Sequence, residues 1–144
     1  MKKILFLALA LAMALALYHP PCGAENSGMK VRLRVGDKVL TATLIDSKTT
    51  QDFISLLPLS LILKDYAGTE KICDLPKRLS TEGAPSGSDP SVGDITYYAP
   101  WGNLAIFYRD FGYSSGLVIL GKIDSGIEAL NVPGSVRVTI ELIK

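Results

Sequence analysis

The sequence predicts a mainly β protein, a small closed or nearly closed barrel of about eight short strands with one or two short helices. Short segments in which apolar and polar residues alternate recur along the chain, and this alternation is typical of half-buried strands. Glycine, proline, serine and aspartate separate these segments, where the chain must turn. The length of 144 residues favours a single domain.

Residues 1–24 are interpreted as a signal peptide. A short basic start precedes an apolar run over residues 4–17. This run is shorter than the about 20 residues of a membrane-spanning helix, but it suits the apolar region of a signal peptide. Cys22 and Ala24 then occupy the −3 and −1 positions of a cut before Glu25. We therefore expect an exported protein, either periplasmic or secreted.

Cys22 leaves a second interpretation open. A cut before this cysteine would produce a lipoprotein, in which the lipidated Cys22 tethers the chain to a membrane. The preceding residues His19, Pro20 and Pro21 match that motif poorly, because an aliphatic residue is expected three places before the cysteine. Simple export is preferred, and a retained N-terminal anchor is a further alternative.

Removal of residues 1–24 limits the chemistry of the mature chain. His19 is the only histidine, and Cys73 is then the only cysteine unless Cys22 is lipidated. Histidine-based triads, Cys–His nucleophiles and histidine-containing zinc sites are therefore excluded. The carboxylates show no spacing typical of a metal site, so neither a metal nor a cofactor is expected. The net charge of +1 comes with scattered basic residues, which argues against a nucleic-acid partner.

The domain is assigned to residues 29–144, after a short polar lead-in at residues 25–28. Its first element is a hairpin over residues 30–45. Alternating apolar and polar residues there flank a Gly36-Asp37 turn of the glycine-first kind. One face of each strand is expected to lie in the core.

A short helix is predicted over residues 50–57. Thr49 is the candidate cap, Asp52 completes a weak capping box, and Pro58 ends the helix. An apolar stripe runs along the segment, so we expect the helix to plug one end of a barrel or to cover one face of a sheet.

The rest of the chain is expected to alternate between short strands and turns. Proline and glycine mark residues 76–90 as a long loop, and long ordered loops in compact domains are often functional. One or two helical turns are expected at residues 124–130. The predicted strands cover residues 59–63, 71–75 (an edge candidate), 94–98, 104–109, 117–123 and 136–142, with a turn at 64–68.

Residues 93–123 carry most of the aromatic side chains of the mature chain, and such a cluster forms either a core or the wall of a binding groove. Tyr97 and Tyr98 are neighbours on one predicted strand, so their side chains point to opposite faces. The same holds for Phe107 and Tyr108. One residue of each pair is expected to be buried, and the other to be exposed or to line the groove.

The candidate ligand-binding residues combine these aromatic side chains with polar neighbours. Trp101 lies in a turn, where a tryptophan either caps a core or stands at the mouth of a pocket. Asn103 most simply ties down that turn through its side-chain amide. The full set of candidates is Tyr66, Arg78, Tyr98, Trp101, Asn103, Phe107 and Tyr113.

Several segments together resemble the cyclophilin-like fold. Residues 116–126 (GLVILGKIDSG) are similar to the strand-to-helix segment of cyclophilins, and the hairpin, the helix and the final strand follow the cyclophilin order. Leu-Pro-Leu at 57–59, Gly-Ser-Asp-Pro at 87–90 and Tyr-Tyr-Ala-Pro-Trp-Gly-Asn-Leu-Ala-Ile-Phe-Tyr at 97–108 are similar to markers of a compact bacterial cyclophilin-like family. The resemblance covers most of residues 29–144 and implies a cyclophilin-like β-barrel.

The resemblance also implies an activity to test, because cyclophilins isomerise the peptide bond before proline. They lower a barrier of about 18–20 kcal/mol with an apolar pocket and an arginine that hydrogen-bonds the prolyl nitrogen. The Phe-His-Arg segment of cyclophilins is replaced here by residues 59–66 (LSLILKDY), which contain neither arginine nor glutamine. The catalytic residue is therefore unknown. Arg78 is the preferred candidate for a displaced donor, and Arg109 is interpreted as a surface ion-pair partner.

Three functions remain open. The preferred one is an exported domain that binds a peptide or small ligand in an aromatic-lined groove without strong catalysis. The first alternative is an active peptidyl-prolyl cis-trans isomerase with a displaced arginine donor. The second alternative is a non-catalytic structural or accessory module. The sequence identifies neither the ligand nor the oligomeric state.

Overall fold

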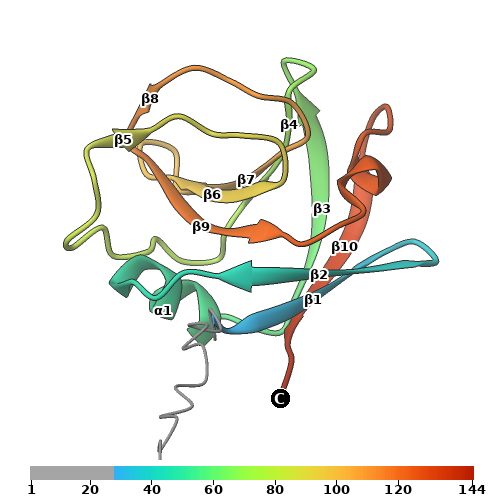
Figure 1. The fold of residues 1–144 in the computed structure, drawn as a ribbon, viewed down its shortest axis with the longest axis horizontal. Helices are drawn as coiled ribbons and strands as arrows, with labels where there is room; N and C mark the ends of the chain where they lie inside the picture. The colour runs from blue at the N-terminus through green and yellow to red at the C-terminus, as the bar shows by residue number, and fades with distance from the viewer. Residues whose placement is uncertain (1–27) are drawn as a thin grey trace, which may run out of the picture.

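The computed structural model describes residues 28–144, and the interpreted signal peptide at residues 1–24 lies outside them. The described chain forms a closed antiparallel barrel, as predicted (Figure 1). The order of strands around the barrel is β1-β10-β3-β4-β7-β6-β9-β2. The barrel strands are β1 (Lys30–Val35), β2 (Lys38–Leu44), β3 (Leu59–Tyr66), β4 (Glu70–Asp74), β6 (Asp94–Tyr98), β7 (Asn103–Phe107), β9 (Leu117–Ile123) and β10 (Val136–Leu142).

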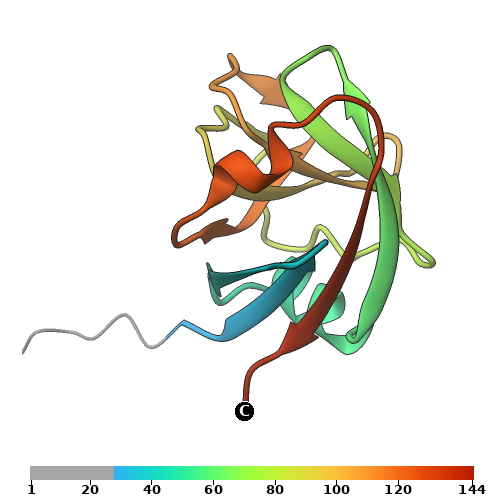
Figure 2. The ribbon, with the colours of Figure 1, turned by 90° about the vertical axis from the view of Figure 1, so that its right-hand side faces the viewer.

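Short elements complete the fold. They are the helix α1 (Lys48–Ser55), the 3-10 helix η1 (Ile127–Leu130), and a two-stranded sheet of β5 (Gly87–Ser88) and β8 (Ser114–Ser115). In Figure 2, β10 runs the length of the molecule beside β3, with which it pairs. No helix among residues 28–144 is both long and apolar enough to cross a membrane.

The predicted hairpin is confirmed by β1 and β2. Leu33 pairs with Leu40 across the two strands, and both side chains are buried in the barrel. Gly36 begins the turn with a φ of 61°, a left-handed conformation that glycine adopts without a steric penalty. Alternation and turn chemistry therefore determine both strands here.

The helix covers residues 48–55 and not 50–57, so it begins and ends two residues earlier than predicted. Ser47, not Thr49, is the N-cap, and its Oγ accepts a hydrogen bond of 3.1 Å from the Thr50 backbone N–H. Thr49 lies within the helix and is buried. Asp52 does not form a capping box. Its carboxylate accepts a hydrogen bond of 2.7 Å from the Ser80 backbone N–H and so fastens the long loop to the helix.

The segment after the helix is a longer strand than predicted. Within the apolar run over residues 59–63, only Leu61 and Leu63 are buried, whereas Ile62 is 48% exposed. One face of β3 therefore lies in the core, and the other face is exposed or half-buried. The strand continues to Tyr66, and the turn predicted over residues 64–68 shortens to Ala67 and Gly68.

The segment predicted as an edge, residues 71–75, is not an edge. β4 pairs with β3 on one side and with β7 on the other. Closure of the barrel explains the difference, because each strand of a closed barrel has two neighbours. β4 also contributes Glu70 to the lining of the pocket described below.

The barrel interior holds the main core, and a lysine is buried on β4 as well. Lys71 is 0% exposed, and its Nζ donates hydrogen bonds to the carbonyl oxygens of Val132 (2.5 Å) and Gly134 (2.7 Å). The same Nζ lies 3.3 Å from the Asp65 carboxylate. These three oxygens replace the water that a lysine ammonium normally keeps, which is what permits its burial.

A second apolar cluster lies apart from this core, on the outer wall of the barrel. Ala105 and Phe107 of β7 and Leu117 of β9 form it, with Ile72 and Tyr98 packed against them. Side chains alternate between the two faces of a strand, so the outward residues of β4, β6, β7 and β9 meet on this wall. This cluster forms part of the floor of the candidate site.

Candidate functional site

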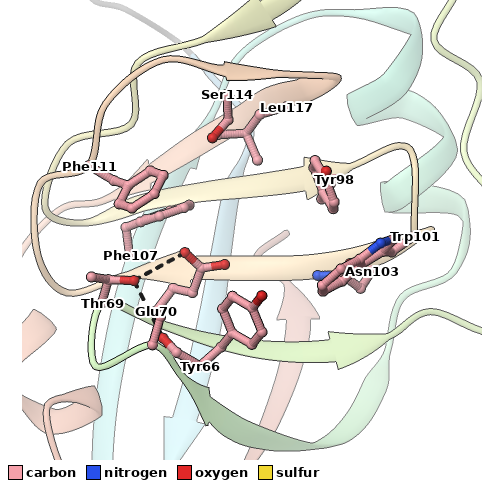
Figure 3. Close-up of a pocket in the computed structure, with 11 residues that line it drawn as sticks. Tyr66, Thr69, Glu70, Tyr98, Trp101, Asn103, Phe107, Phe111, Ser114 and Leu117 are labelled. Carbon is pink, nitrogen blue, oxygen red and sulfur yellow. Dashed lines mark hydrogen bonds between the residues drawn. The ribbon is translucent and has the colours of Figure 1, made fainter.

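A pocket of about 210 Å³ opens on the outer wall of the barrel (Figure 3). Its residues come from the end of β3 and the start of β4, from the hairpin of β6 and β7, and from the segment that follows β7. The lining residues are Tyr66, Ala67, Thr69, Glu70, Tyr98, Trp101, Asn103, Phe107, Phe111, Ser114 and Leu117.

Three aromatic rings meet at one side of the pocket. Trp101 is 56% exposed at the tip of the β6–β7 hairpin. Its ring meets the Tyr98 ring at a centroid distance of 5.4 Å and an interplanar angle of 79°, and the Tyr66 ring at 5.7 Å and 86°. These edge-to-face contacts hold neighbouring rings nearly perpendicular, so they form adjoining walls.

The hairpin turn sets the position of Trp101. The Gly102 backbone N–H donates a hydrogen bond of 2.9 Å to the Tyr98 carbonyl oxygen, and Gly102 has a φ of 70°. A side chain at this position would strain the backbone, so glycine holds the turn that presents Trp101 beside Tyr98.

Phenylalanine rings form the opposite side of the pocket. Phe107 is buried at the end of β7, and its ring centroid lies 6.3 Å from that of Phe111, which is 49% exposed. Figure 3 shows the Glu70 side chain between these two rings on one side and the Trp101 and Tyr98 rings on the other.

Glu70 is the only charged residue in the pocket lining. It lies directly opposite Phe107 on the paired strands β4 and β7. The Thr69 hydroxyl donates a hydrogen bond of 3.3 Å to its carboxylate, and burial of the carboxyl group raises the pKa of Glu70 above its ordinary value. The pocket therefore combines aromatic walls with a half-buried acid.

Asn103 carries an unusual polar atom. Its side chain is 2% exposed, and its Nδ2 donates a hydrogen bond of 3.1 Å to the Leu104 carbonyl oxygen. Its Oδ1 is buried and accepts no hydrogen bond from the described residues. A buried acceptor without a donor is energetically costly, and this oxygen is also closed to solvent.

Comparison with known proteins identifies the family. The model of a family described as the Cyclophilin-like family matches residues 33–141, which is most of the chain. The protein belongs to the cyclophilin-like family. The resemblance noted in the sequence is thereby confirmed.

A solved structure shares the fold of this cyclophilin-like domain. The solution structure of a hypothetical protein from Archaeoglobus fulgidus is similar with a TM-score of 0.58 and 18% sequence identity. The similarity covers 84% of this chain and 99% of that one. At this level of identity it shows the fold alone. No curated protein matches the sequence.

The cyclophilin-like barrel brings together many of the residues singled out from the sequence. Tyr98 lines the pocket, whereas its neighbour Tyr97 is buried in the barrel core, as the strand alternation predicted. Phe107 lines the pocket, and Tyr108 is buried elsewhere, its hydroxyl donating a hydrogen bond to Asp65 at 2.5 Å. Tyr66, Trp101 and Asn103 complete the predicted residues that line the pocket.

Arg78 and Tyr113 do not line this pocket. The Arg78 guanidinium donates a hydrogen bond of 2.9 Å to the Ala99 carbonyl oxygen, so it supports the hairpin that carries Trp101. The hydroxyl groups of Tyr113 and Ser86 are 3.2 Å apart. Both contacts hold loops in place and lie outside the pocket lining of the cyclophilin-like domain.

The sequence interpretation missed six residues of the pocket lining. Glu70 lies one residue before a strand predicted to begin at 71, and Phe111 belongs to no helix or strand. Alternation along β4 is the signal that could have revealed Glu70, because it places Glu70 on the same face as Ile72, which packs against the cluster on the outer wall. The six residues are Ala67, Thr69, Glu70, Phe111, Ser114 and Leu117.

Proposed function

We propose that the protein is an exported cyclophilin-like binding domain. It holds a small ligand, or one side chain of a peptide, in the aromatic pocket and does so without strong catalysis. The observation that supports this function is the arrangement of aromatic rings from separate parts of the chain around one cavity on the outer wall. Concave apolar sites with a few polar groups are typical of ligand-binding pockets.

The size of the pocket limits what it would hold. Its volume of about 210 Å³ lies below the about 300–1,000 Å³ that is common for pockets of drug-sized ligands. A single side chain or a ligand with a few carbon atoms is therefore the appropriate occupant.

The absence of a cationic donor favours binding over isomerisation. A prolyl isomerase of the cyclophilin kind uses a positively charged donor against the prolyl nitrogen. The lining residues include no arginine or lysine, and Arg78 already donates to the Ala99 carbonyl oxygen. We therefore expect little stabilisation of a twisted peptide bond in this pocket.

Intrinsic fluorescence tests the binding function directly, because Trp101 is the only tryptophan of the chain. We expect some members of a set of small ligands and short peptides to change its emission and to raise the melting temperature. Tyr66→Ala removes one wall of the pocket and should weaken that binding by at least about tenfold. Tyr113→Ala removes an exposed tyrosine outside the lining and is the matched control.

A flat emission response to every ligand would contradict the proposal, as would equal losses of affinity in Tyr66→Ala and Tyr113→Ala. Export is tested separately by the intact mass of the protein recovered outside the cytoplasm. A chain that begins at Glu25 is expected, and a lipid-modified Cys22 would instead indicate an anchored lipoprotein.

A further inference from the structure

The charge of the pocket suggests which ligands it selects. The lining contains one carboxylate, that of Glu70, and no basic side chain. Aromatic faces carry a negative electrostatic potential, so the surrounding rings add to the negative charge of the acid. The whole cavity is therefore suited to a positive charge.

Glu70 differs in its partners from three other carboxylates of the fold. Asp65, Asp94 and Asp124 each lie between 3.0 and 3.7 Å from a lysine Nζ. Within residues 28–144, Glu70 makes no such ion pair, and its side chain accepts only the hydrogen bond from Thr69. A half-buried carboxylate without a counter-ion is a costly arrangement that a cationic ligand would relieve.

The rings around Glu70 would contribute to the same preference. A cation near Glu70 would lie among the faces and edges of Tyr98, Trp101 and Phe107, and an ammonium group is attracted to an aromatic face within about 6 Å of its centroid. The alkyl part of the ligand would then contact the apolar lining, to which Leu117 also contributes.

The free acceptor sites of Glu70 indicate what kind of cation would fit. Its carboxylate accepts only the hydrogen bond from Thr69 among the described residues. A primary ammonium would donate N–H hydrogen bonds to this carboxylate, whereas a quaternary ammonium, which has no N–H, would not. The carboxylate therefore favours a cation that carries N–H donors.

We propose that the pocket binds an alkylammonium group that carries N–H donors, with its charge at Glu70 and its short alkyl chain against the aromatic rings. This inference rests on the proposed function, because it names the class of ligand for the same pocket. The group belongs either to a free small amine or to the side chain of a lysine in a peptide, and the two sources share this chemistry.

Matched ligands test the proposal on the mature protein, with Trp101 fluorescence as the signal. n-Butylammonium carries the charge and the N–H donors, 1-butanol has similar shape without charge, and tetramethylammonium has charge without N–H donors. We expect n-butylammonium to bind at least about tenfold more tightly than either of the others. Capped lysine and capped norleucine extend the comparison, and tighter binding of capped lysine than of n-butylammonium would assign the group to a peptide.

Glu70→Gln should abolish the preference for n-butylammonium over 1-butanol. Glu82→Gln is the matched control, because Glu82 is exposed and outside the pocket lining. Wild-type protein gives an independent measurement. Binding of n-butylammonium should weaken as the pH falls and Glu70 takes up a proton, and binding of 1-butanol should not.

Four outcomes would overturn the inference. If 1-butanol binds as tightly as n-butylammonium, or if Glu70→Gln keeps the preference, the cation specificity is wrong and the pocket remains a binding site for neutral ligands. If neither the charged nor the neutral ligands alter Trp101 emission, the proposed binding function fails together with the inference. Equal binding of tetramethylammonium and n-butylammonium would contradict the role of the N–H donors.

Discussion

At the scale of single residues, Glu70 and Lys71 show how one strand divides two charged neighbours between different environments. The Lys71 side chain points into the barrel and is surrounded by the oxygens of Val132, Gly134 and Asp65. Glu70 points outward into the pocket, where Thr69 is its hydrogen-bond donor. Alternation along β4 produces both results.

Loss of the Lys71 ammonium should destabilise the barrel. Lys71→Met keeps most of the side-chain volume but leaves the carbonyl oxygens of Val132 and Gly134 without their donor. We expect the free energy of unfolding to fall by about 2–3 kcal/mol, measured by urea denaturation. Lys122→Met is the control, since that side chain is 58% exposed, and a change within about 0.5 kcal/mol is expected there. Equal losses in the free energy of unfolding for the two substitutions would show that the buried hydrogen bonds of Lys71 do not stabilise the barrel.

Glu70 should make stability depend on pH in an uncommon direction. Its pKa is raised in the folded protein, so the folded state retains this proton to higher pH than the unfolded state. The associated stabilisation is present below the unfolded value of about 4.3 and is lost as the pH rises through the folded pKa. Relative to wild type, Glu70→Gln should therefore gain stability as the pH rises from about 4.3 through the folded pKa of Glu70.

Urea denaturation of the ligand-free protein at a series of pH values measures this trend. Glu82→Gln should track wild type across the same range, because Glu82 lies outside the pocket. A stability difference between Glu70→Gln and wild type that stays constant or shrinks as the pH rises would contradict the raised pKa.

At the scale of elements, the strands follow closely from the sequence and the helix follows less well. The strands predicted at residues 94–98 and 117–123 have those bounds in β6 and β9, because turn residues mark both ends of each. The start of α1 was misplaced because Thr49 and Ser47 are both good caps by residue type. Only the fold decides between them, by burying Thr49.

The cap assignment leads to a direct test. Ser47→Ala removes the acceptor of the Thr50 backbone N–H and should lower the free energy of unfolding by about 1 kcal/mol. Ser125→Ala, at an exposed position outside the helices and strands, should change it by less than about 0.5 kcal/mol. Thermal and urea unfolding measure the stability of both variants. If Ser47→Ala is as stable as wild type, the cap does not contribute to the free energy of unfolding.

At the scale of the whole molecule, the order of the strands around the barrel is what the sequence predicts least. Alternation shows which side chains share a face, but it does not show which strands are neighbours, and so residues 71–75 were taken for an edge. The aromatic part of the pocket was predictable because those rings crowd a short stretch of chain. Glu70 and Phe111 were not, since the fold brings them to the pocket from β4 and from a segment without regular structure.

The whole fold also bears on the isomerase alternative. We expect a protease-coupled assay with an X-Pro peptide to show no rate increase above the uncatalysed reaction, because the pocket lining holds no cationic donor. Arg78→Ala should leave that result unchanged. A clear acceleration by wild type that Arg78→Ala abolishes would instead assign the displaced-donor role to Arg78.

The continuous ring of paired strands has a consequence for any peptide that binds to the outer wall of the barrel. Every barrel strand already has a neighbour on both sides over at least part of its length, so an incoming chain finds few free backbone amides and carbonyls to pair with on the described barrel. A bound peptide would be recognised mainly through the side chain that it inserts into the pocket, and the peptide residues on either side of that side chain would be free to vary.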